Sequence, residues 1–127
     1  MQSLIANVDH EARCTKMNAG LTPGAALAAL AAEGGEFVTL FRHGTLEVEI
    51  YRPVGVDRQQ AHKKDELYVI ISGTGTFLHG AERSAIAPGD VLFAPAGIAH
   101  RFIEFSRDFA TWVFFYGPEG DEAGRQS

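Results

Sequence analysis

Short runs rich in β-branched and aromatic residues recur about every ten positions between residues 36 and 117, with Gly, Pro and Asp between them. The segment ELYVIISGTGTFLHG shows the pattern, because one apolar run ends in a GTG turn and a second run follows. Strands of this length and spacing are typical of antiparallel sandwiches and barrels. The chain also has 14 glycines and 5 prolines in 127 residues, which favours a fold with many turns. We therefore expect an all-β, antiparallel fold.

One short helix is expected ahead of the strands. Thr22 suits the N-cap, Pro23 suits the first helical position, and the Gly-Gly pair at 34–35 suits the end. A chain of 127 residues fits a single domain. Its expected parts are an N-terminal extension (1–20), the helix (22–34), a barrel (36–117) and a flexible tail (118–127) without apolar periodicity.

Two predicted strands, LYVII at 67–71 and WVFFY at 112–116, are apolar without alternation, so both of their faces should be covered. One cover is the barrel interior. The other is a partner sheet, the Ala-rich helix or a second subunit, and in so small a protein we expect a symmetric homodimer. The run at 46–50 alternates instead, with Leu46, Val48 and Ile50 on one face and Glu47 and Glu49 on the other.

The charge balance excludes some partners. There are 11 basic and 16 acidic residues, a net charge of −5, which argues against binding to nucleic-acid phosphates. No apolar run approaches the ~20 residues that span a bilayer, and the N-terminus lacks the pattern of a secretory signal. A single cysteine, Cys14, excludes an internal disulfide and suits a reducing compartment. We expect a cytoplasmic protein that binds neither nucleic acid nor membranes.

Polar residues stand directly ahead of the apolar run at 67–71. Residues two apart on a strand face the same way, so Gln60 and His62 should project together, and Glu66 opens the buried strand. Lys64 shares this parity and would be costly to bury unpaired. A bulge or loop across residues 63–65 would turn the lysines outward and leave His62 and Glu66 inward.

A second histidine, His100, follows Pro95 and Gly97 in similar apolar company about forty positions later. Imidazole nitrogen, carboxylate oxygen and amide oxygen are all ligands for divalent Mn, Fe, Ni or Zn. Aromatic side chains of the neighbouring strands, Tyr68 and Phe102, are candidates to line the pocket beside such an ion. Both are also good core residues.

These residues resemble the two motifs of the cupin family. Its first motif runs from a glycine through a His-x-His pair and a Glu to a second glycine, and Gly55, His62, Glu66 and Gly73 match it. Its second motif, a glycine followed by Pro-x-Gly and a His, is matched by Gly89, Pro95, Gly97 and His100. The resemblance covers residues 55–104 and implies an antiparallel jelly-roll β-barrel.

The first motif departs from the family pattern, because Gln60 replaces the first histidine of the His-x-His pair. Some cupin sugar-phosphate isomerases hold a metal with Gln-x-His, so the resemblance still implies a mononuclear divalent metal (Fe, Mn, Zn or Ni). Its implied ligands are Gln60, His62, Glu66 and His100. The alternative is a metal-free barrel in which these side chains form a hydrogen-bonded polar cluster.

Two functions follow from this resemblance. Two neutral imidazoles, an amide and one carboxylate leave a divalent ion with about one net positive charge and open positions, which suits anionic oxygen donors. The first hypothesis is a metal-dependent enzyme of dioxygenase or isomerase type, acting on a small polar, anionic molecule, with Glu66 as proton acceptor. The alternative is a non-catalytic cupin that binds a sugar or small acid.

Overall fold

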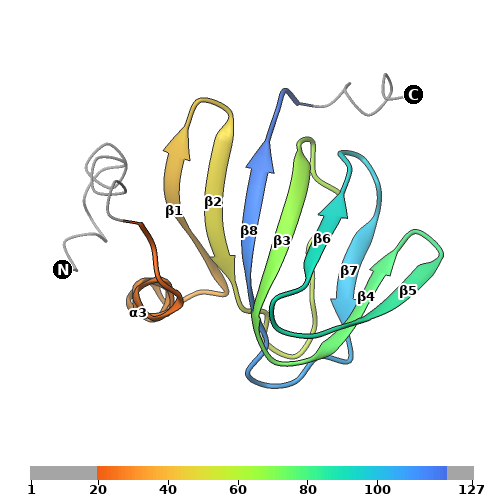
Figure 1. The fold of residues 1–127 in the computed structure, drawn as a ribbon, viewed down its shortest axis with the longest axis horizontal. Coiled ribbons are helices and arrows are strands. Elements are labelled where there is room, and N and C mark those ends of the chain that lie inside the picture. Colours follow the sequence, from red (N-terminus) through yellow and green to blue (C-terminus); the bar gives the residue numbers. More distant parts are fainter. Residues whose placement is uncertain (1–19, 120–127) are drawn as a thin grey trace.

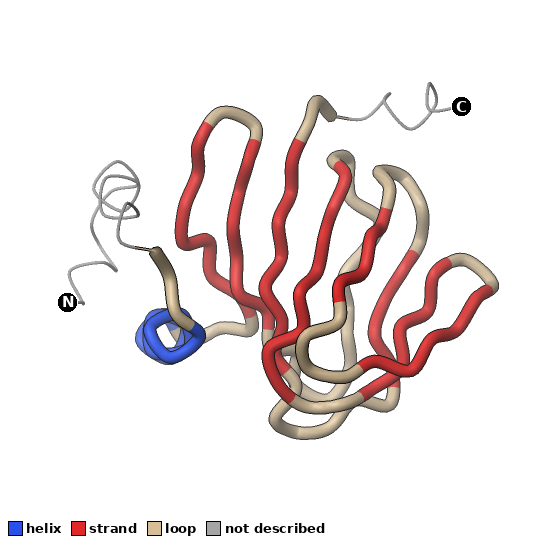
Figure 2. The backbone as a smooth tube through the Cα atoms, viewed as in Figure 1, coloured by secondary structure: helices blue, strands red, loops and turns tan. Residues whose placement is uncertain are grey.

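The computed structural model describes residues 20–119 and contains eight strands and one helix in that range (Figures 1 and 2). The elements are α3 (Pro23–Glu33), β1 (Phe37–His43), β2 (Leu46–Tyr51), β3 (Asp65–Ser72), β4 (Gly75–His79), β5 (Glu82–Ile86), β6 (Val91–Ala94), β7 (His100–Ile103) and β8 (Ala110–Tyr116). The predicted extension, up to residue 19, and the predicted tail, from residue 120, lie outside the described residues.

The strands form two antiparallel sheets (Figure 1). The larger sheet has the order β1-β2-β8-β3-β6, and the smaller has the order β5-β4-β7. Because β8 pairs with both β2 and β3, the last strand of the chain closes the gap between the first hairpin and the strand that carries Glu66. The predicted all-β jelly-roll barrel with one short helix is confirmed.

The helix forms where its end signals predict. The Thr22 hydroxyl accepts a hydrogen bond from the Ala25 amide (3.1 Å), and Gly34, at φ 84°, ends the helix and donates to the Leu30 carbonyl (2.9 Å). Its buried residues, Ala26 and Leu30, pack with Val38, Leu40 and Ile50 on the outer face of β1 and β2. The helix therefore covers the edge of the large sheet that lies farthest from β6 (Figure 2).

Aromatic rings fill the space between the two sheets. Tyr68 of β3 contacts Phe77 of β4 and Phe102 of β7, with ring centroids 5.7 and 4.9 Å apart, and Phe102 contacts Phe109 at 4.7 Å. All four side chains are buried. Aromatic packing of this kind joins the two sheets, and the rings of Tyr68 and Phe77 also contact His100, with centroids 5.9 and 6.1 Å away.

The outer face of the large sheet is covered only in part. Ile71 and Trp112 pack against the cluster under α3. On β6, however, Val91 and Phe93 are 63% and 46% exposed. The helix is thus one of the covers expected for the two non-alternating strands.

Candidate metal centre

Three side chains from separate elements converge at one end of the barrel. Glu66 is the second residue of β3, His100 is the first residue of β7, and His62 lies in the loop before β3. The chain bends at Lys63 and Lys64, as predicted, but Asp65 already belongs to the strand. Lys64 does not turn outward: its side chain is only 18% exposed, its ammonium donates to the Thr45 carbonyl (2.9 Å) and it lies 3.8 Å from Glu47 Oε2. The cost of burying this lysine is thus met by an acceptor and a carboxylate and not by solvent.

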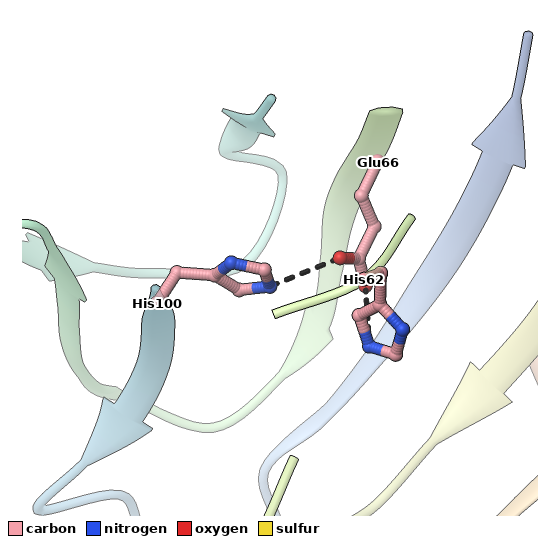
Figure 3. A group of neighbouring side chains, drawn as sticks. All are labelled: His62, Glu66 and His100. Atoms are coloured by element: carbon pink, nitrogen blue, oxygen red, sulfur yellow. Dashed lines mark ion pairs between the residues drawn. The ribbon is translucent and has the colours of Figure 1, made fainter. Parts of the chain in front are cut away.

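The Glu66 carboxylate lies between the two imidazoles (Figure 3). His100 Nε2 is 2.9 Å from Glu66 Oε1, and His62 Nε2 is 3.9 Å from Glu66 Oε2. One donor atom from each of the three residues falls within 4.8 Å of the others. The three residues can therefore hold a single metal ion.

The hydrogen-bonding state of these atoms also fits a metal. Both carboxylate oxygens of Glu66 and the Nε2 of His100 are buried, and none of them has a hydrogen-bond partner of good geometry among the described residues. The 2.9 Å approach of Glu66 Oε1 to His100 Nε2 is a short ion-pair contact whose geometry is poor for a hydrogen bond. Buried polar atoms are rarely left in this state unless an ion or a water satisfies them. Donors without partners that aim at a common point are what a bound divalent ion requires.

Backbone and side-chain contacts hold the imidazoles in place. His100 Nδ1 lies 2.8 Å from the Ile98 carbonyl, so the ring proton belongs on Nδ1 and Nε2 is left as a ligand. The Gly97 amide donates to the His62 carbonyl (2.9 Å), and the Ala96 amide donates to Asp65 Oδ1 (2.9 Å). These two bonds join the loop that carries His62 to the turn that precedes His100, and so fix the distance between the two motifs.

The electrostatics of His100 reflect the same arrangement. Burial alone would lower the pKa of this imidazole, but the Glu66 carboxylate, the Ile98 carbonyl and the more distant Asp57 charge outweigh it, and the net pKa is raised. Burial raises the pKa of the Tyr68 hydroxyl well above its usual range, and the Glu66 charge adds to the effect. Glu66 is thus a concentrated negative charge with little solvent around it, and it favours a cation nearby.

A cavity of about 700 Å³ opens beside the cluster. Glu66 and His62 line it, whereas His100 is not among its lining residues. Its walls come mainly from the inner face of the large sheet and from the loop before β3. The lining residues that carry charge are Glu36, Glu47, Glu49, Glu66 and Glu119 on the acidic side and Arg58, Lys63 and Lys64 on the basic side.

Glu47 and Glu49 are site residues that the sequence did not single out. The expected alternation of β2 holds, but the acidic face is the one that borders the cavity. Burial, together with the charges of Glu47 and Glu66, raises the pKa of Glu49 to about 7, although a hydrogen bond from Thr39 (3.2 Å) opposes the shift. The signal available in the sequence was two glutamates inside a strand that pairs with an apolar run.

The two adjacent glutamines occupy different environments. Gln60, predicted as a ligand, is exposed and is not among the residues that line the cavity. Gln59 does line the cavity, and its amide is engaged: Nε2 donates to Asp57 Oδ2 (2.7 Å) and Oε1 accepts from the Tyr68 hydroxyl (2.9 Å). The segment is a loop here and not a strand, so the two-residue parity that placed Gln60 beside His62 does not apply.

The two predicted pocket aromatics are fully buried. Tyr68 is 0% exposed and Phe102 is 1% exposed, and both belong to the core between the sheets and not to the lining of the cavity. The Tyr68 hydroxyl donates to Gln59 (2.9 Å), which lines the cavity, and the Tyr68 ring packs against His100, with centroids 5.9 Å apart. Instead, Val113 and Phe115 of β8 form the apolar floor, and the Phe115 ring lies 4.8 Å from the ring of His62.

Comparison with known proteins agrees with this geometry. The sequence profile described as the cupin domain matches residues 47–116. An uncharacterized protein of Streptomyces coelicolor is 35% identical over 91 residues, which are 70% of this chain and 87% of that protein. The matched segment of the profile includes all three residues of the cluster.

Solved structures share the fold at low identity. KdgF from Halomonas sp. superposes with a TM-score of 0.56 at 16% identity, over 65% of this chain and 79% of that one. A cupin-2 domain from Rhodospirillum rubrum superposes with a TM-score of 0.56 at 21% identity, over 67% of this chain and 61% of that one. Among the described residues, no helix is long and apolar enough to cross a membrane.

Proposed function

The chain belongs to the cupin family, and we propose that it is a metal-dependent enzyme that acts on a small polar molecule. The observation that carries this proposal is the set of buried donor atoms without partners on Glu66 and His100, beside a cavity that His62 also lines. A ligand in that cavity would meet the ion from the side of His62 and Glu66, because His100 lies behind them.

The ion would be held by His62, Glu66 and His100 and would supply Lewis-acid chemistry or a platform for oxygen. Glu66 orients both imidazoles and, where an oxygen is free of the ion, can accept a proton from the ligand. Gln60 completes the set only if its exposed side chain turns inward. Gln59, which already bonds Asp57 and Tyr68, shapes the wall of the cavity.

One variant pair tests the metal assignment. His62→Ala should lower the divalent metal that copurifies with untagged protein, measured by elemental analysis, while leaving the fold intact by circular dichroism. Lys63→Ala, next to it and exposed, is the matched control and should keep the metal. Unchanged metal content in His62→Ala would contradict the proposal, and the element found would separate oxygen chemistry (iron) from isomerisation (zinc or manganese).

A metal-free binding protein is the second candidate. The 2.9 Å approach of His100 Nε2 to Glu66 Oε1 favours it, because a charged imidazole can compensate the carboxylate without an ion. In that case the wild-type protein would hold no stoichiometric metal after dialysis against a micromolar zinc or manganese buffer, but it would still bind a sugar or small acid.

We also propose that the protein is a homodimer that covers the exposed part of the large sheet. Val91 and Phe93 on β6 support this proposal, because they are exposed apolar residues on an edge strand. Light scattering at micromolar concentration should give twice the chain mass of 13.7 kDa, and Phe93→Lys should return it to the monomer mass. A monomer mass for the unaltered protein would contradict the proposal.

A further inference from the structure

The inner face of the large sheet carries a second group of polar residues beside the metal cluster. In the large sheet, Glu66 pairs across β8 with Phe115, and Phe115 pairs with Glu47, so these three side chains share one face. Glu49 lies two residues farther along β2, on the same face. Two strand spacings and an offset of two residues separate Glu49 from Glu66, so their Cα atoms stand about 12 Å apart along this face.

The glutamates of the cavity differ in their charge partners. Glu36 lies 3.6 Å from Arg58, and Glu47 lies 3.5 Å from Arg42 and 3.8 Å from Lys64. Glu49, by contrast, accepts a hydrogen bond from the Thr39 hydroxyl and makes no direct ion pair among the described residues, although the Arg42 charge also acts on it. Glu49 is therefore a carboxylate of β2 that can pair directly with a cation from outside the chain.

The cavity carries a separate sign of a ligand, because Glu66, on the same face of the sheet, is 1% exposed and both its oxygens lack hydrogen-bond partners among the described residues. A molecule that lies along this face would meet the two carboxylates at its two ends. At the Glu66 end, a bound ion would reverse the local charge and favour an oxygen donor. At the Glu49 end no ion is held, and a carboxylate without a direct ion pair favours a positive group.

We propose that Glu49 is a specificity-determining residue that binds a cationic amine of the substrate, and that the substrate class is a small zwitterion with an oxygen donor at one end and an ammonium group at the other. This inference rests on the proposed metal-dependent function. The sequence predicts an anionic ligand. In the proposed substrate, the negative charge stays at the end that meets the ion, and a positive charge lies at the other end.

A series of three acids with one six-carbon backbone tests the proposal. 6-Amino-2-hydroxyhexanoate, 2-hydroxyhexanoate and 2-hydroxyadipate share the metal-binding end and differ only in an ammonium, methyl or carboxylate group at the other end. Their dissociation constants are measured by titration calorimetry on the full chain loaded with Mn²⁺. We expect 6-amino-2-hydroxyhexanoate to bind about tenfold more tightly than 2-hydroxyhexanoate, because its ammonium group would form a partly buried ion pair with Glu49. We expect 2-hydroxyadipate to bind most weakly, because its second carboxylate would repel Glu49.

The variant Glu49→Gln keeps the shape of the side chain and removes its charge, so it should abolish the preference for the ammonium group and leave Mn²⁺ affinity unchanged. Glu82→Gln, exposed on β5, is the matched control and should keep the preference. Equal affinities for the three acids, or tightest binding of 2-hydroxyadipate, would overturn the inference even if Glu49→Gln did not fold, because that comparison uses the unaltered protein.

The same experiment separates the two proposals. Mn²⁺ binding without ligand discrimination leaves the metal-dependent function standing and overturns the role of Glu49. Absence of Mn²⁺ binding overturns the metal-dependent function, and the three acids are then compared on the metal-free protein. There, a preference for the ammonium compound that Glu49→Gln removes still supports the role of Glu49, and its absence overturns that role.

Discussion

Asp57 and Glu66 are carboxylates of nearly equal burial, 2% and 1% exposed, but their surroundings are opposite. Asp57 Oδ1 accepts hydrogen bonds from the Tyr51 hydroxyl (2.5 Å) and the Gln59 amide (3.0 Å). Its Oδ2 accepts from Gln59 Nε2 (2.7 Å) and the Phe102 amide (2.8 Å). Glu66 has two imidazoles nearby and no hydrogen-bond partner of good geometry among the described residues.

The difference in hydrogen bonding indicates a structural role for Asp57 and a ligand-binding role for Glu66. Asp57 joins the loop before β3 to Tyr51 of β2 and to Phe102 of β7. These bonds hold the loop that carries His62 against the strand that carries His100. The Asp57 charge is compensated by donors of the chain itself. Glu66 carries a similar desolvation cost with the two imidazoles as its only charge partners among the described residues, and a bound cation would lower that cost.

Removal of Asp57 should have the largest effect. Asp57→Ala leaves several buried donors without an acceptor, so we expect the free energy of unfolding to fall by about 3–5 kcal/mol. Urea denaturation followed by circular dichroism measures it. A loss below about 1 kcal/mol, the size of one ordinary hydrogen bond, would contradict the structural role of Asp57.

Glu66→Gln should have little effect on stability and a large effect on metal affinity. In metal-free protein its stability should stay within about 1 kcal/mol of the unaltered chain or rise, because a buried charge without hydrogen bonds is removed. Its metal affinity, measured by competition with a chelator, should fall by more than the roughly 10–100-fold that changes behind the ligands cost. A destabilisation as large as that of Asp57→Ala would erase the contrast between the two carboxylates.

Glu49 is half-buried and has one hydrogen bond, so it lies between Asp57 and Glu66 in compensation, and its effect should appear in the pH dependence of stability. Its pKa is raised from 4.5 to about 7 in the folded protein, so between these values the folded state binds more protons than the unfolded state. The free energy of unfolding of metal-free protein should therefore decline as pH rises from 4.5 to about 7, by about 1–3 kcal/mol, and level off above. Glu49→Gln should remove this decline, whereas Glu82→Gln should retain it.

Tyr51→Phe should give the smallest effect. It removes one of the four hydrogen bonds to Asp57 and leaves the others, so we expect a loss of about 1 kcal/mol in the free energy of unfolding. Tyr116→Phe, at the end of β8 and half-buried, is the matched control and should change stability less. Equal effects of the two changes would show that the Asp57 network contributes no more than a surface hydroxyl.

The strands and their ends were accessible from the sequence because the determinants are local. The Thr22 cap, the proline that follows it and Gly34 define the helix, and the two motifs that contain His62, Glu66 and His100 identify the family. The bend at Lys63 and Lys64 also followed from local cost, but the expected outward turn of Lys64 was wrong, because the Thr45 carbonyl and Glu47 hold its ammonium in a largely buried position.

The residues that line the cavity could not be predicted from such local signals. Alternation separates Glu47 and Glu49 from the apolar face of β2, but only the packing of α3 on the apolar face and the pairing of β2 with β8 turn the glutamates toward the cavity. Likewise, parity does not decide between Gln59 and Gln60 in a loop, where the hydrogen bonds to Asp57 and Tyr68 select Gln59.

By itself, the sequence determined which elements form and which residue types are available for chemistry, because turn residues, caps and strand periodicity act over a few neighbouring positions. Tertiary structure decided which donor atoms meet. Glu66 and His100 are brought to 2.9 Å by the closing of two sheets, and the insertion of β8 places Glu49 on the same sheet face as Glu66. Such distances depend on contacts between segments far apart in the chain, which no local pattern encodes.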